Sequence, residues 1–179
     1  IDNKGQFKND ISSPRLRTNP EDGVKEFVVA WAHETTIGKD IVITQLDIRQ
    51  IQLAKAAIYT GCKLLIQEWN CNVQDISTVS LAGAFGNHVN LKNLLILGMI
   101  PNVDVQKIVP IGNAACDGAI EALCNTSKLA EASWVSDFAQ HINISSQKKF
   151  FRKELLASMH IPHKFDVFYI LIIKFTTLF

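Results

Sequence analysis

Two glycine-containing turns, each directly after a short apolar run, are the parts of this sequence best suited to binding a ligand. The first turn follows residues 79–82. Glycine permits positive φ angles and a close approach of the backbone to a ligand, and consecutive backbone N–H groups in such a turn can surround phosphate or ribose oxygens. A strand-to-turn junction without a ligand is the alternative for residues of these types. The candidate binding residues here are Gly83, Ala84, Phe85, Gly86 and Asn87.

A second turn repeats this pattern at Gly112 and Asn113, which follow the apolar residues 108–111. Small residues come next, at the start of a predicted helix over residues 114–125. Small side chains allow a helix to approach another backbone closely. We interpret the turn either as a hinge between two lobes or as tight packing of a helix on a sheet, and both residues of the turn join the candidate binding residues.

No other pattern indicates catalysis or metal binding. The five histidines are scattered, and His160 and His163 are too isolated to predict a metal site. The four cysteines contain no C-x-x-C pair, so a zinc ribbon or an iron–sulfur cluster is not expected in this chain. We expect reduced thiols and a cytoplasmic protein, since no secretory signal is present. We therefore predict no catalytic residue and no metal ligand.

The composition is that of a globular protein. Hydrophobic residues make up 47% of the 179 residues and charged residues 20%, a balance unlike that of disordered chains. The net charge of +1 gives no broad attraction to nucleic acid or to an acidic membrane. Neither nucleic acid nor a membrane is therefore an expected partner.

The strongest helical signal covers residues 45–69. Thr44 is a good N-cap, and Asp47 stands where a capping box places an acidic residue. Lys55 lies among alanines, and we expect its ammonium group to be accessible. An apolar stripe at helical spacing predicts the buried face. The residues of this stripe are Ile51, Ala54, Ile58, Cys62, Leu65, Ile66 and Trp69.

Strands and helices alternate along the chain, which predicts an α/β fold with some parallel pairing. The predicted strands cover residues 25–31, 41–44, 79–82 and 108–111, with a further edge strand at 141–145. The other predicted helices cover residues 91–97, closed by Gly98, then 114–125, 128–139 with Ser127 as its cap, and 147–159.

The last 16 residues, 164–179, are strongly apolar but carry Lys164, Asp166 and Lys174. They are fewer than the ~20 apolar residues that a membrane helix needs. A docked strand or helix, a non-native extension and a membrane anchor are the three interpretations.

Several separated blocks, in order, resemble one family. "DIVITQLDIRQIQLAKAAIYTGCKLLIQ", "VSLAGAFGNHVN" and "PIGNAACDGAIEAL" resemble the C-terminal ATPase-like domain of the reductive activators of corrinoid-dependent proteins, which belong to the actin, heat-shock chaperone and sugar kinase superfamily. "IDNKGQF" and "FFRKELLASMHIPH" resemble the two ends of that domain. The resemblance covers residues 1–163, leaving 164–179 as an apolar tail of uncertain origin.

The resemblance implies an α/β fold, the C-terminal lobe of an actin-like (ribonuclease H-like) ATPase with a central mixed sheet flanked by helices. It implies that residues 83–87 hold the adenosine side of ATP, bound with Mg²⁺, and that residues 112–118 connect two lobes. Family members return an inactive Co(II) corrinoid protein to the Co(I) state with an electron from an N-terminal iron–sulfur domain. The implied partner is a corrinoid protein or a corrinoid-dependent methyltransferase, and a homodimer is possible.

The sequence departs from the family in four places. It has no D-x-G-T phosphate loop and no cysteine cluster, Cys116 stands where the family usually has a glycine, and the tail after His163 has no counterpart. We therefore expect a domain truncated at its N-terminus that does not hydrolyse ATP alone. Two alternatives remain: an activator of another redox enzyme of the superfamily, and a non-catalytic docking module for the corrinoid protein.

Overall fold

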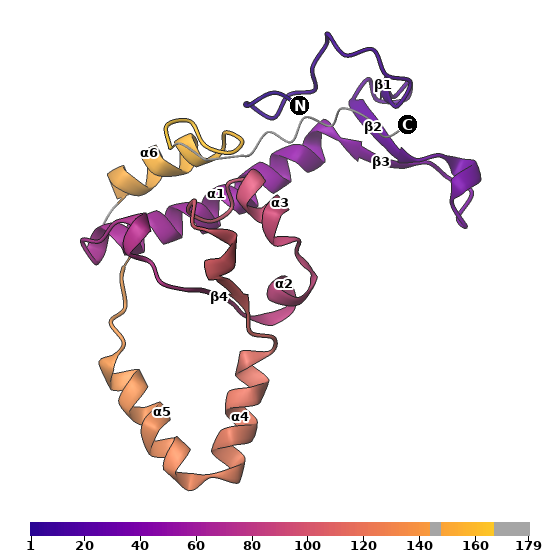
Figure 1. Ribbon diagram of the computed structural model, residues 1–179. Helices are drawn as coiled ribbons and strands as arrows, with labels where there is room; N and C mark the ends of the chain where they lie inside the picture. Colours follow the sequence, from indigo (N-terminus) through magenta and orange to yellow (C-terminus); the bar gives the residue numbers. More distant parts are fainter. Residues whose placement is uncertain (144–147, 167–179) are drawn as a thin grey trace.

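The computed structural model describes residues 1–143 and 148–166, and these residues form two small sheets joined by one long helix (Figure 1). Three strands pair antiparallel in the order β1-β2-β3, and two further strands pair parallel. The predicted α/β alternation is confirmed, but the single central sheet is divided in two. The strands are β1 (Leu16–Thr18), β2 (Lys25–Ala30), β3 (Ile41–Thr44), β4 (Val79–Leu81) and β5 (Ile108–Pro110).

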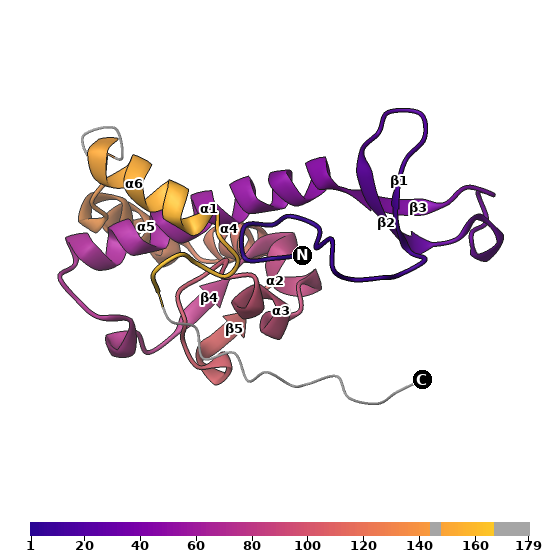
Figure 2. The ribbon, with the colours of Figure 1, turned by 90° about the horizontal axis from the view of Figure 1, so that it is seen from above.

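Helix α1 is the axis of the molecule, and α6 lies along it in both views (Figures 1 and 2). The antiparallel sheet stands beyond the N-terminal end of α1, away from β4 and β5 (Figure 2). The helices are α1 (Gln45–Glu68), α2 (Gly83–His88), α3 (Leu91–Ile96), α4 (Ala114–Cys124), α5 (Thr126–Phe138) and α6 (Lys148–Ser158), with 3₁₀ turns η1 (Ala32–Glu34), η2 (Val73–Asp75) and η3 (Val105–Lys107).

The start of α1 is fixed by the predicted capping box. The Thr44 hydroxyl accepts a hydrogen bond from the backbone N–H of Asp47 at 3.2 Å, and the Asp47 carboxylate accepts one from the backbone N–H of Thr44 at 2.8 Å. Both N–H groups would otherwise lack partners at the helix end. The hydrogen bonds lower the pKa of the Asp47 carboxyl group, so the charged cap is maintained at neutral pH.

The buried face of α1 is not the predicted apolar stripe. Ile51, Ile58, Leu65 and Trp69 are exposed, so this prediction was wrong. The face that is buried mixes apolar and polar side chains. Its members are Ile48, Gln52, Lys55, Ala56, Tyr59, Thr60 and Leu64.

Polar side chains on the buried face hold the C-terminal segment 159–166, which we call the closing segment. Lys55, expected to be accessible, is fully buried, and its ammonium group donates to the backbone oxygens of Gly98 (3.3 Å), His160 (2.7 Å) and Pro162. Gln52 donates to the backbone oxygen of Met159 at 2.6 Å. These bonds explain the burial of the Lys55 ammonium group and of the Gln52 amide nitrogen, because a buried polar group is tolerated when it has hydrogen-bond partners.

One cluster of the hydrophobic core is formed by the chain that runs from α3 to β5, beside the parallel strand pair. Its fully buried members come from this short stretch of sequence, and residues of β4 and η2 pack on its rim. The core therefore fixes the position of β4 and β5, where the glycine turns begin. The core residues are Leu94, Met99, Ile100, Val103 and Ile108.

Helices α4 and α5 form a hairpin that projects from the rest of the chain (Figure 1). Neither helix buries a residue, and the small residues of α4 do not pack on a sheet in the described chain. The cap of α5 is Asn125, whose side chain accepts from the backbone N–H of Ser127, and not Ser127 itself as predicted. Large apolar side chains are exposed along the hairpin: Ile120, Leu123, Leu129, Trp134, Val135 and Phe138.

The remaining predictions can be compared with the described residues. All four cysteines are free, as expected. Residues 141–143 are not a strand, and the rest of the predicted edge strand lies outside the described residues. In the part of the chain that the structure describes, no helix has the length and apolar character required to cross a membrane. Of the apolar tail, only residues 164–166 are described.

Candidate functional site

The first glycine-containing segment was predicted to be a turn, but it is the short helix α2, which begins at Gly83. This segment and the turn at Gly112, for which we keep the name glycine turns, lie side by side because β4 and β5 are neighbouring parallel strands. Val79 pairs with Ile108 and Leu81 with Pro110, so the carboxyl ends of both strands meet at one edge of the sheet. Beyond the strands, the backbone N–H of Gly83 donates to the oxygen of Gly112 at 2.6 Å. The turns therefore form one continuous backbone structure. Ligands of α/β folds bind outside the carboxyl ends of parallel strands.

Glycine is required in this structure for two different reasons. Gly83 and Gly112 have φ angles of +72° and +63°, which side chains other than glycine rarely adopt. Gly86 is required by contact, because a Cβ atom there would lie 2.2 Å from the backbone oxygen of Leu81. A Cβ at Gly83 would meet no atom within 4 Å among the described residues. Gly83 is thus the position where a ligand could approach the backbone.

The other predicted binding residues have different surroundings. Asn113 is exposed, and its side chain caps α4 by accepting from the backbone N–H of Cys116 at 3.3 Å. Ala84, Phe85 and Asn87 belong to α2, but their side chains lie outside what the structure describes. The assignment of all seven residues to a ligand stays a prediction.

An open cavity of about 480 Å³ lies elsewhere, between the N-terminal segment, β2 and the start of α1. Part of its wall is already paired, since Gln45 donates to the oxygen of Gly5 at 2.6 Å and accepts from the N–H of Phe7 at 3.1 Å. Neither glycine turn contributes to this cavity. Its lining residues are Gln6, Phe7, Asn9, Val24, Lys25 and Gln45.

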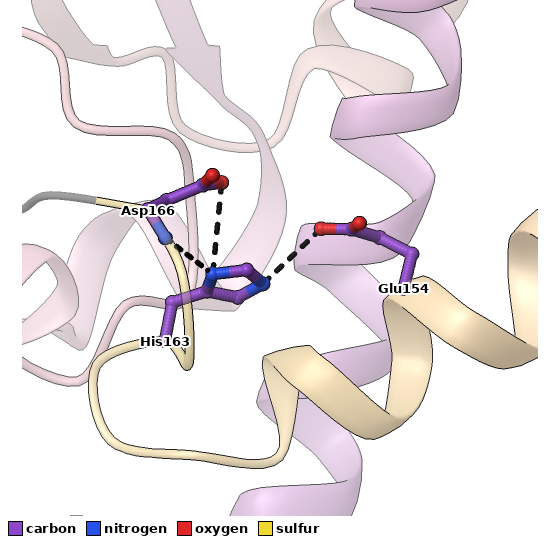
Figure 3. Close-up of side chains that lie close together, drawn as sticks. All are labelled: Glu154, His163 and Asp166. Atoms are coloured by element: carbon purple, nitrogen blue, oxygen red, sulfur yellow. Dashed lines mark hydrogen bonds and ion pairs between the residues drawn. The ribbon is translucent and has the colours of Figure 1, made fainter.

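A cluster of ionisable side chains joins α6 and the closing segment (Figure 3). Nε2 of His163 lies 3.1 Å from Oε1 of Glu154, and Nδ1 lies 3.7 Å from Oδ2 of Asp166. The imidazole side chain is only 1% exposed. Burial lowers the pKa of His163 below its usual 6.5 and outweighs the opposing effect of the two carboxylates. His163 is therefore neutral at pH 7.

The cluster was missed in the sequence because its members come from separate elements. Asp166 also accepts hydrogen bonds from the Tyr59 hydroxyl and, at 2.9 Å, from the Lys63 ammonium group of α1. Burial raises the pKa of Asp166, but these two donors and the positive charge of Lys63 outweigh burial, so the pKa lies below the usual 3.8. Only the pair His160 and His163 could have drawn attention to this region, and their spacing alone indicated nothing.

Glu154, His163 and Asp166 each offer an atom close enough to share a metal ion, since these atoms lie within 4.8 Å of one another. The hydrogen bonds of the imidazole contradict that role. Nδ1 accepts from the backbone N–H groups of Phe165 (3.1 Å) and Asp166 (2.9 Å), so the proton of the neutral ring is on Nε2. A protonated nitrogen has no lone pair for a metal, and Nε2 is the nitrogen that faces Glu154, whereas Asp166 lies nearer to Nδ1.

Replacing Asp166 with asparagine is expected to lower the free energy of unfolding by about 1–2 kcal/mol at pH 7, because a charged acceptor for Tyr59 and Lys63 is lost. Since the pKa of Asp166 is lowered in the folded state, its contribution is present above pH 3.8 and is lost as the pH falls through the folded value. Urea unfolding at several pH values measures both effects. The exposed Asp10→Asn is the control, and an equal loss in both variants would contradict the prediction.

Comparisons with known proteins agree with this architecture. Residues 1–170 match the family described as the C-terminal domain of RACo, the ASKHA domain. The corrinoid activation enzyme RamQ of Eubacterium limosum is 34% identical over 139 residues, which are 78% of this chain and 23% of that protein. A solved structure, the reductive activator for corrinoid, iron-sulfur protein, is 34% identical with a TM-score of 0.81, covering 91% of this chain and 26% of the other. This chain thus spans about a quarter of the length of either relative.

Proposed function

Because this chain belongs to the family of C-terminal ASKHA domains of RACo, with the actin-like fold of that family, we propose that it is the C-terminal lobe of an ATP-dependent reductive activator. The activator returns an inactive Co(II) corrinoid protein to the Co(I) state. The observation that carries the proposal is the hydrogen bond from Gly83 to Gly112, which joins the two predicted nucleotide turns at the carboxyl end of β4 and β5.

The open backbone at Gly83 supports the assignment of the glycine turns to the adenosine side of a nucleotide. Gly83 is half-buried and open in front of its Cα atom, so its backbone is available for close approach. Gly112 and Asn113 stand beside it and lead into the N-terminus of α4. Residues 83–87, 112 and 113 are the proposed contacts to ATP. ATP supplies free energy by binding more tightly to one conformation of the complex than to another, and its hydrolysis releases that conformation.

The binding of Mg²⁺ and the terminal phosphates, and the supply of the electron, are assigned in this proposal to other residues than 83–87, 112 and 113. No D-x-G-T loop for Mg²⁺ and the terminal phosphates is present in the sequence, and no cysteine cluster for an iron–sulfur centre. We propose that the longer activator provides both and acts in the cytoplasm on a corrinoid protein or a corrinoid-dependent methyltransferase. Residues 1–163 form the domain in this proposal.

ATP titrated into the ¹⁵N-labelled chain is expected to bind with a Kd in the millimolar range, because only one wall of the site is present. Backbone amide signals of residues 83–87 and 112–113 should move together. Gly83→Val, which places a side chain in the open space at a positive φ, should weaken binding at least tenfold. Gly38→Val is the matched control, with φ +63° and open space in a different loop. Signals that move only around Gln6 and Gln45, or micromolar binding with turnover, would contradict the proposal.

A further inference from the structure

The turn at residues 163–166 is held together by a neutral imidazole. Nδ1 of His163 accepts from two consecutive backbone N–H groups, those of Phe165 and Asp166. Nε2 lies 3.1 Å from Oε1 of Glu154 on α6, but the two atoms are not aligned for a hydrogen bond. Both atoms are buried and have no hydrogen-bond partner in the described chain. The neutral ring therefore acts as an acceptor for its own turn.

The same turn attaches the closing segment to α1 through Asp166, which accepts from Tyr59 and Lys63. The ionisable groups that act on His163 come from three directions: Glu154 on α6, Asp166 on its own segment, and Tyr59, Lys55 and Lys63 on α1. The Tyr59 ring lies 5.1 Å from the imidazole, centre to centre. Any change in the charge of His163 thus acts directly on the contacts that hold the turn.

We propose that residues 163–166 form a latch on α1 that opens when His163 takes up a proton. A proton on Nδ1 converts this atom from a hydrogen-bond acceptor to a donor. Nδ1 can then no longer accept the hydrogen bonds from the backbone N–H groups of Phe165 and Asp166. Oδ2 of Asp166, 3.7 Å away, is the acceptor for the new N–H group. Pairing with the imidazolium draws this carboxylate away from Tyr59 and Lys63, and the turn separates from the helix.

Opening is confined to the end of the closing segment. The oxygens of His160 and Pro162 are held by Lys55, and that of Met159 by Gln52, and neither donor forms a hydrogen bond with His163. The latch therefore releases residues 163–166 while residues 159–162 stay on α1. This pattern distinguishes the latch from acid unfolding of the whole chain, which would expose all of these contacts together.

Hydrogen exchange of the whole chain, corrected for the intrinsic pH dependence of exchange, tests the proposal between pH 8 and pH 5. Protection of the Phe165 and Asp166 amides should fall at least tenfold as the pH decreases below about 6.5, while the amides of α1 stay protected. His163→Gln should remove this pH dependence, and the exposed His33→Gln should retain it. Equal protection of the two amides at pH 8 and pH 5, or unchanged pH dependence in His163→Gln, would overturn the proposal.

A second measurement covers the case in which His163→Gln does not fold. The imidazole signals of His163 in the wild-type chain are followed by NMR over the same pH range, together with the two amides. If the latch exists, the imidazole signals of His163 and the protection of the two amides change with the same pH midpoint. Titration of the ring without any loss of protection at Phe165 and Asp166 rejects it.

Discussion

Replacing Lys55 with methionine is expected to lower the free energy of unfolding by about 2–4 kcal/mol, among the largest effects of any single substitution in this chain. Methionine retains most of the length of the side chain but leaves the backbone oxygens of Gly98, His160 and Pro162 without their common donor. Each unpaired buried acceptor costs about 1–3 kcal/mol, and relief from burying the ammonium group offsets part of the sum. Urea unfolding followed by far-UV circular dichroism measures the change.

Lys63→Met is the control on the same helix. Lys63 forms a partly exposed ion pair with Asp166, and such pairs contribute about 1 kcal/mol or less. A loss in Lys55→Met no larger than that in Lys63→Met would show that the three carbonyl contacts do not stabilise the fold.

The pH dependence provides a second readout for Lys55. Burial lowers the pKa of Lys55 from 10.5 to about 8, so the ammonium form with its three donors predominates at pH 7. Between about pH 8 and 10.5 the unfolded chain binds more protons at this residue than the folded chain. The contribution of Lys55 to stability therefore increases with pH in this window, and the increase should be missing in Lys55→Met.

Gly98→Ala is expected to lower the free energy of unfolding by about 3 kcal/mol or more. Gly98 ends α3 with a φ of +66°, and an added Cβ would lie 2.3 Å from the backbone oxygen of Pro162. The left-handed conformation itself costs alanine about 1–2 kcal/mol. The rest of the effect comes from the clash, which can be relieved only by moving the closing segment away from α3 and from Lys55.

Gly38→Ala separates these two contributions. Gly38 has nearly the same φ of +63°, but a Cβ there would meet no atom within 4 Å in the described chain. Its substitution should cost only the conformational part, about 1–2 kcal/mol. Equal losses at both positions, measured by the same urea titration, would mean that the contact between Gly98 and Pro162 imposes no constraint.

Local signals predicted most of the helices and strands. Thr44 and Asp47 mark the start of α1 because their capping bonds involve neighbouring residues. Gly98 marks the end of α3 because its positive φ is a local requirement. The juxtaposition of Gly83 and Gly112 could also be anticipated, since two strands followed by similar turns favour parallel pairing.

The orientation of α1 could not be predicted from periodicity. A prediction from hydrophobic periodicity takes the most apolar face of a helix as the buried one. In α1, the buried face is instead the one whose polar side chains donate hydrogen bonds to backbone oxygens far away in the sequence. Gln52 and Lys55 find these partners in the closing segment, more than a hundred positions along the chain. The alanines beside Lys55 were a usable signal, because small neighbours leave room for other backbone to approach. The prediction that these alanines leave the Lys55 ammonium group accessible to solvent was wrong.

The outward-facing aromatic residues determine which spectroscopic probe can report the state of the fold. Trp69 and Trp134 are 79% and 61% exposed in the native structure, and Trp31 is only half-buried. Since unfolding moves the rings of Trp69 and Trp134 from one aqueous environment to another, the wavelength of their emission should shift little. Dyes such as ANS should bind the native fold through the apolar residues of α4 and α5, so a bright dye signal in this protein is no indicator of a molten globule.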